Sequence, residues 1–240
     1  MAIKNREFVE IEYVGRVAST NQVFDLTSES LAKIEGVFSR HARYGPRVIC
    51  LGQGRVVKGL DHFLEGKESG VSYTVTLAAR DAFGLKDPKL LRMVPSKIFL
   101  QQGVKPMAGL RVNLDRSMGT IKSVSSGRVV VDFNHPLAGR EVNYEFTITR
   151  AITDPKEQLV SFLNTTLRMP IDQFKVSVKE NMATVELPLQ LPPQFTSALG
   201  KKLAELTHLK EVQFTFVPGK QDHGHDHHDH DHGDHHGHQH

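Results

Sequence analysis

The chain has 240 residues, of which 39% are hydrophobic and 24% charged, so its composition is that of an ordinary globular protein. No stretch approaches the roughly 18 apolar residues of a membrane span, and a single cysteine, Cys50, excludes an internal disulfide. Residues 1–221 hold all 30 Lys and Arg but only 22 of the 27 Asp and Glu, a net charge of +8 without any dense basic run. We therefore expect no membrane or nucleic-acid partner, and the charged first residues, unlike a signal peptide, favour a cytoplasmic protein.

The first 84 residues predict short strands and two short helices. Apolar and polar side chains alternate in FVEIEYVGRV and again in SYTVTLAARDAFG, as they do in a strand with one buried face. Glycines bound GRVVKGLDHFLEGKESG, a predicted helix that carries Leu60, Phe63 and Leu64. The expected strands are 8–17, one within 19–27, 47–52 and 72–84, and the expected helices lie within 28–46 and 54–70.

A new segment begins after Gly84. Residues 86–99 predict a short helix or turn, and residues 112–134 predict strands joined by Met-Gly and Ser-Gly turns. Residues 141–152 alternate once more as a strand.

The residues from Asp154 onward predict a compact α+β unit. Asp154 and the proline that follows it are typical of a helix start, and the apolar side chains of the next turns recur at helical spacing on one face. These side chains are Leu159, Phe162, Leu163 and Leu167. A hairpin with its turn at Glu180-Asn181, a second helix over 193–209 and a last strand over 211–217 follow.

The chain ends in DHGHDHHDHDHGDHHGHQH, which holds ten histidines and five aspartates. Imidazole is a common ligand for Ni²⁺ and Zn²⁺, so this tail is expected to bind one of these ions and, lacking apolar residues, to be disordered without it. The interspersed Asp and Gly favour a natural metal-binding tract over a purification tag. The expected ligands are His223, His225, His227, His228, His230, His232, His235, His236, His238 and His240.

Five motifs in order, EYVG, VFD, VVKGLDHFLEG, RDAFG and NHPLAGREVNYEFTI, resemble the FKBP-type peptidyl-prolyl isomerases. The resemblance covers about residues 5–153 and is strongest to the SlyD-like and long archaeal members, in which an insert-in-flap chaperone domain interrupts the isomerase domain and which often end in a His-rich tail. It implies an α+β fold in which an antiparallel sheet wraps a short helix. The implied domains are the isomerase at 1–84 and 137–153, the insert at 85–136, a C-terminal α+β domain at 154–219 and the tail at 220–240.

The resemblance also implies where catalysis occurs. Rotation about a prolyl bond faces a barrier of about 18–20 kcal/mol, and its catalyst needs no cofactor or nucleophile but an apolar pocket with a few polar groups that favour the twisted amide. Leu60 would be the floor under the proline ring, and Asp25 would help to orient the substrate carbonyl. The residues implied are Tyr13, Phe24, Asp25, Val56, Val57, Leu60, Phe83 and Tyr144. Leu60, Phe83 and Tyr144 replace the Trp, Tyr and Phe of the commonest single-domain pattern, so we expect weaker binding of macrolide ligands.

In relatives the insert presents an apolar groove to unfolded chains, so unfolded or nascent polypeptides and proline-containing peptides are the expected partners. Held there, a chain delivers each proline to the pocket at a raised effective concentration. The candidate groove residues are Leu90, Leu91, Met93, Val94, Ile98, Phe99 and Leu100. The alternative is that most of them form the small core of the insert.

Three functional questions stay open at this point. The C-terminal domain could form a homodimer, bind clients or only stabilise the chain. The whole protein could instead store or deliver metal with the isomerase domain as a scaffold, or bind peptides without catalysis, although an intact Asp25 argues against the last. Lone histidines are expected to be structural, with His135 the exception to watch because the insert rejoins the isomerase domain there.

Overall fold

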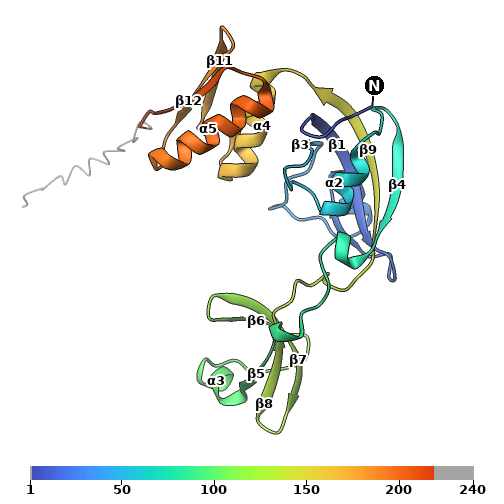
Figure 1. Cartoon of the computed structure of the whole chain (residues 1–240). Coiled ribbons are helices and arrows are strands. Elements are labelled where there is room, and N and C mark those ends of the chain that lie inside the picture. Colours follow the sequence, from blue (N-terminus) through green and yellow to red (C-terminus); the bar gives the residue numbers. More distant parts are fainter. Residues whose placement is uncertain (1, 219–240) are drawn as a thin grey trace, which may run out of the picture.

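The computed structural model describes residues 2–218, and their strands form three separate sheets (Figure 1). The first sheet has five strands in the order β2-β1-β9-β4, with β3 also pairing with β1, and every pair is antiparallel. Its strands are β1 (Phe8–Val17), β2 (Val23–Leu26), β3 (Arg47–Cys50), β4 (Ser72–Leu77) and β9 (Val142–Ile152), and its helices are α1 (Glu29–Ile34) and α2 (Lys58–Leu64). The predicted α+β class is confirmed.

Helix α2 lies against one face of this sheet (Figure 1). Val9, Ile11 and Tyr13 are buried because alternate side chains of β1 point to the same face, where they meet Leu60 and Leu64 of α2. The strand expected over 72–84 ends early, at Leu77, because its partner β9 begins at the paired residue Val142. The chain then turns through the short 3₁₀ helix η1 (Ala79–Asp81), which brings Phe83 toward the sheet.

The second sheet belongs to the insert and has the order β5-β8-β7-β6. Its elements are η2 (Pro88–Leu90), β5 (Leu91–Pro95), α3 (Ser96–Gln101), β6 (Arg111–Leu114), β7 (Ser117–Ser125) and β8 (Arg128–Asp132). Its buried core consists of Phe99, Val112, Ile121, Val129 and Val131, and it is separate from the core around α2.

The expectations for the insert need three corrections. Residues 86–99 hold the expected short helices, η2 and the start of α3, but residues 91–95 between them form a strand. The β6–β7 turn lies at Asp115 and Arg116, both with positive φ, and Gly119 stands inside β7, where an added Cβ would lie 2.6 Å from Cγ1 of Val131. Phe99 is 1% exposed, so it belongs to the core of the insert and not to a client groove. The Ser-Gly turn is confirmed between β7 and β8.

Two neighbouring segments, 84–90 and 133–139, connect the insert to the first sheet. The Gly139 N–H donates to the Gly84 carbonyl at 2.8 Å, and the Asp87 N–H donates to Oδ1 of Asn134 at 2.8 Å. Asn134 also donates to Asp132 from Nδ2 and from its backbone N–H. Burial raises the pKa of the Asp132 carboxyl, but these two hydrogen bonds and Lys86 outweigh it and lower that pKa. The two connections are therefore held to each other at both ends.

The third sheet has the order β10-β11-β12. Its unit comprises α4 (Pro155–Leu167), η3 (Ile171–Gln173), β10 (Lys175–Lys179), β11 (Met182–Leu187), α5 (Pro193–Thr207) and β12 (Glu211–Phe216). The predicted hairpin turn at Glu180 and Asn181 is confirmed, and β12 pairs with β11 in parallel after the α5 crossover. Gly200 lets α5 approach β12 closely, since its Cβ would lie 2.5 Å from the Val212 carbonyl oxygen.

The third unit shares a hydrophobic core with the first sheet. Phe8 and Ile152 pack in the same buried cluster as Leu159 and Phe162, and the rings of Phe8 and Phe162 meet edge to face at 6.4 Å. Cys50 lies in this cluster too, and burial raises the pKa of its thiol to about 12. The shared core places α4 beside β3.

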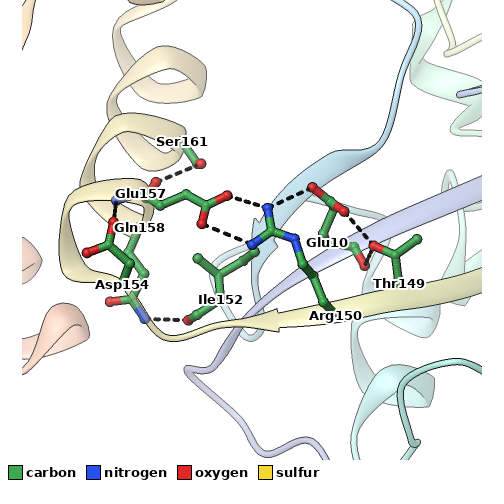
Figure 2. A network of polar contacts seen from close by, with 8 residues as sticks. All are labelled: Glu10, Thr149, Arg150, Ile152, Asp154, Glu157, Gln158 and Ser161. Atoms are coloured by element: carbon green, nitrogen blue, oxygen red, sulfur yellow. Dashed lines mark hydrogen bonds and ion pairs between the residues drawn. The ribbon is translucent and has the colours of Figure 1, made fainter.

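A polar network fixes the junction between β9 and α4 (Figure 2). The Arg150 guanidinium bridges Glu10 of β1 at 3.1 Å and Glu157 of α4 at 3.0 Å. Asp154 caps α4 by accepting from the Glu157 N–H at 3.0 Å, and Thr149 donates to Glu10 at 2.7 Å. The Thr149 hydrogen bond and Arg150 lower the pKa of Glu10 although its burial opposes the shift, so the Glu10 carboxylate stays a charged partner of Arg150 near neutral pH.

Candidate functional site

All eight predicted pocket residues come together on one side of the first sheet. Tyr13, Leu60 and Tyr144 are buried in the cluster between the sheet and α2, and Phe24, Val56, Val57 and Phe83 pack against it partly buried. Asp25 joins them through Tyr13. Five chain segments supply this group: β1 carries Tyr13, β2 carries Phe24 and Asp25, the start of α2 carries both valines and Leu60, the loop after η1 carries Phe83, and β9 carries Tyr144.

The polar centre of the site is a hydrogen bond between Tyr13 and Asp25. The Tyr13 hydroxyl donates to Oδ2 of Asp25 at 2.7 Å, while Nη2 of Arg47 lies 3.4 Å from the other carboxylate oxygen. Burial, reinforced by the Asp25 charge, raises the pKa of Tyr13, so the hydroxyl remains a proton donor at neutral pH. Asp25 stays partly exposed and keeps its carboxylate at the border between apolar wall and solvent.

Arg47 is the residue of this site that the sequence did not indicate. Its guanidinium lies over the Tyr13 ring at 5.3 Å, an arrangement favoured by the ring quadrupole. It reaches that place because β3 pairs with β1 in a register that sets Arg47 opposite Ile11. An isolated arginine at a strand start carries no signal of this contact, since the β1–β3 register is not readable from the chain.

Four aromatic rings form the wall of the site. Phe24 stands at its centre, edge to face with Phe83 at 5.5 Å and with Tyr144 at 5.7 Å, and Tyr144 in turn contacts the Tyr13 ring at 6.0 Å. Such edge-to-face pairs hold their rings in fixed orientations. The wall is thus rigid and apolar, with one carboxylate at its edge.

Substituting Gly15 by Ala should disturb this wall. An added Cβ would lie 2.6 Å from Cζ of Phe24 and 3.0 Å from Cε1 of Tyr144, so the rings must shift. We expect the free energy of unfolding to fall by about 1–3 kcal/mol in urea denaturation, as overpacked cores do, together with lower activity of the site. Glu12→Ala, at an exposed position of the same strand, is the control. An unchanged urea midpoint in Gly15→Ala would contradict this prediction, because it would show that the Phe24 ring moves aside without a cost in stability.

His135, the histidine that the sequence analysis singled out, adds a fifth ring to the aromatic wall. Its ring is stacked on Phe83 at 4.7 Å and 2° between planes. Nδ1 accepts the Leu137 N–H at 3.2 Å, which fixes the ring orientation at the point where the insert rejoins the sheet. A residue of the insert connection therefore contacts the aromatic wall directly.

The candidate groove residues of the insert divide into two groups. Val94 is half-buried and packs with Phe99 in the core. The others are exposed by 36% to 62% of their surface, and they are Leu90, Leu91, Met93, Ile98 and Leu100. Leu91 and Met93 share one face of β5, and beside Met93 a shallow depression of about 390 Å³ extends to Val130 and Arg128.

The ten tail histidines lie outside the described residues. Within residues 2–218, no three His, Cys, Asp or Glu side chains gather closely enough to hold a metal ion. Over the same range no helix combines the length and apolar character needed to cross a membrane.

Comparison with known proteins gives two family matches. A family described as FKBP-type peptidyl-prolyl cis-trans isomerase matches residues 1–97, and one described as FKBP26, IF domain, matches residues 92–137. Both matches lie ahead of β9 and the C-terminal unit.

Among curated proteins, the chain is 29% identical over 155 residues to the short-type peptidyl-prolyl cis-trans isomerase of Methanocaldococcus jannaschii, an alignment covering 65% of this chain and 96% of that protein. It is 37% identical over 110 residues to the FKBP-type isomerase SlyD of Vibrio cholerae, covering 43% and 54%. For SlyD of Escherichia coli K12 the values are 33% over 113 residues, covering 45% and 57%. The chain thus spans little more than half the length of these SlyD proteins.

Proposed function

The chain belongs to the FKBP-type peptidyl-prolyl cis-trans isomerases, with SlyD-like relatives, and we propose that it assists folding by rotating X-Pro bonds in the pocket beside Asp25 while its insert holds the unfolded client. The observation that carries this proposal is the Tyr13–Asp25 hydrogen bond at the edge of an aromatic wall. It is what the reaction needs: an apolar surface with one oriented polar group.

The pocket would act on the rotation barrier without bond-making to the protein. An amide loses its C–N double-bond character in the twisted transition state, and the carbonyl then becomes less polar. Leu60 and the aromatic wall would take the proline ring out of water, which favours the less polar twisted form over the planar one. Asp25, held by the Tyr13 hydroxyl and Arg47, would lie near the preceding carbonyl and help to orient its dipole through the charge of the carboxylate, which has no hydrogen to donate to it. No cofactor enters the step.

The client-holding role rests on the exposed apolar side chains of the insert. Leu91, Met93 and Leu100 are each exposed by 44% or more, although Phe99 and its neighbours already satisfy the core. Met and aliphatic surfaces adapt to many sequences, which suits unfolded or nascent polypeptides as partners.

The tail and the C-terminal unit have accessory roles in this proposal. The ten tail histidines would bind Ni²⁺ or Zn²⁺, on the strength of their composition. The C-terminal unit would bind clients or pair two copies of the chain, and its exposed Phe195, Phe216 and Val217 support either role.

Truncation after Lys220 separates this proposal from a metal-storage protein. We expect the truncated chain to retain its turnover of a Leu-Pro peptide and its acceleration of proline-limited refolding, because the pocket and insert lie within residues 2–218. It should lose the binding of Ni²⁺ that calorimetry detects in the whole chain. Both chains are assayed with and without Ni²⁺. Loss of folding assistance on truncation would instead favour a protein whose main work is metal handling.

A further inference from the structure

A second cavity, with a volume of about 1090 Å³, lies between the isomerase domain and α4. It opens beside β3, at the place where the shared core brings α4 against the first sheet. Its walls include Arg43, Arg47 and Arg55 on the isomerase side and Asn164, Arg168 and Asp172 on the α4 side. We call it the arginine cleft.

The arginine cleft has a strong excess of positive charge. Four guanidinium groups line it against one carboxylate, that of Asp172. Among the residues that the structure describes, Arg43, Arg55 and Arg168 make no ion pair, and the only one of Arg47 is its 3.4 Å contact with Asp25. Unneutralised cations facing one another across a hollow favour an anionic occupant.

Arg55 shows that this charge is held in place. Its guanidinium lies 4.3 Å from the centre of the Phe162 ring and donates to the Thr166 hydroxyl, both in α4. It is half-buried, and burial lowers its pKa, which reflects the cost of keeping a cation away from water without a carboxylate. An arriving carboxylate would offset that cost, and a bidentate pair needs little further ordering of a side chain already fixed.

Arg47 joins the arginine cleft to the prolyl pocket. It lines the cleft, and it also contacts Asp25 and covers the Tyr13 ring. An extended peptide advances about 3.3–3.6 Å per residue, so a chain whose proline occupies the pocket can lay its flanking residues in the adjoining cleft. This continuity favours the client chain itself as the occupant over a separate polyanion.

We propose that the arginine cleft binds Asp and Glu side chains of the client near the target proline, so that the isomerase turns over acidic X-Pro segments preferentially. This rests on the proposed function and adds a substrate preference to it. The C-terminal unit contributes one of the four arginines, Arg168, and seven of the fifteen residues that line the cleft.

The test compares peptides that share a central Leu-Pro and carry either two Glu or two Gln, placed before or after the proline. In the full-length chain, one of the Glu peptides should have a kcat/KM about tenfold higher than its Gln counterpart, and the difference should shrink as salt is added. The variant Arg43→Gln/Arg168→Gln should lose this advantage and turn over the Gln peptides normally. Lys179→Gln/Lys201→Gln removes equal charge from exposed sites outside the cleft and should keep it.

Equal kcat/KM for Glu and Gln peptides, or an advantage that survives Arg43→Gln/Arg168→Gln, would overturn the proposal while leaving the isomerase function intact. If no peptide is turned over, the isomerase function itself fails, and fluorescence anisotropy of the same peptides still shows whether the cleft selects Glu. A single-stranded oligonucleotide that binds more tightly than the Glu peptide, and only when both arginines are present, would assign the cleft to nucleic acid instead.

Discussion

Replacing Asp25 by Ala is expected to lower kcat/KM for a Leu-Pro peptide by roughly ten- to a hundredfold. A hydrogen bond to a charged group contributes about 1.5–3 kcal/mol, and each ~1.36 kcal/mol in the barrier is tenfold in rate. The Asp25 carboxylate has two roles in this site. It accepts a hydrogen bond from the Tyr13 hydroxyl at 2.7 Å, and its ion pair with Arg47 holds that guanidinium over the Tyr13 ring. Its loss leaves the pocket apolar but without an oriented group at its edge.

The controls for Asp25→Ala separate chemistry from folding. Tyr13→Phe keeps the ring in the wall and removes only its donor, so it should cost less than Asp25→Ala. Because Asp25 is partly exposed but accepts from the buried Tyr13 hydroxyl, its removal should lower the free energy of unfolding by only about 1 kcal/mol in urea denaturation. Activity equal to that of the native chain in Asp25→Ala would assign the reaction to the apolar wall alone.

Excising residues 86–136 and joining the connections with a short Gly-Ser loop should separate peptide turnover from folding assistance. The excision is feasible because Gly84 and Gly139 are already hydrogen-bonded to each other at 2.8 Å and because the core of the insert is separate from the pocket core. Turnover of a Leu-Pro peptide should stay within a few-fold of the native value. Acceleration of proline-limited refolding should fall by about a hundredfold, since tethering raises effective affinity by 10²–10⁴.

We expect the excision to change peptide turnover by a few-fold because it removes one contact of the aromatic wall. His135 lies within the excised residues, so its stacking on Phe83 at 4.7 Å would be lost. His135→Ala in the otherwise native chain measures this contribution alone. If the excised chain refolds proteins as fast as the native one, the insert does not hold clients and the exposed side chains of β5 need another explanation.

The grouping of the eight predicted pocket residues could be predicted because they stand in short motifs that resemble the FKBP-type isomerases. Tyr13, Phe24 and Leu60 each lie at a fixed place within a strand or helix, so a motif in the chain becomes a wall of the pocket once the sheet forms. Arg47 could not be predicted, because only the pairing of β3 with β1 brings it to Asp25.

The insert was less predictable for a different reason. Strand β5 is short, with Leu91 and Met93 exposed and Val94 half-buried, so periodicity alone did not separate strand from turn in residues 86–99. Gly119 was read as a turn residue, whereas it stands in β7 because Val131 leaves no room for a side chain. The shared core of Phe8 and Phe162 likewise depends on tertiary packing between segments far apart in the chain.

The central claim is that this chain rotates X-Pro bonds, and exchange NMR of a short Leu-Pro peptide in the presence of the whole chain tests it most directly. The account predicts a cis/trans exchange rate that rises with enzyme concentration and saturates with peptide. Chemical-shift changes at Tyr13, Phe24 and Tyr144 should follow the same titration. An exchange rate that stays at the uncatalysed value at every enzyme concentration would contradict it.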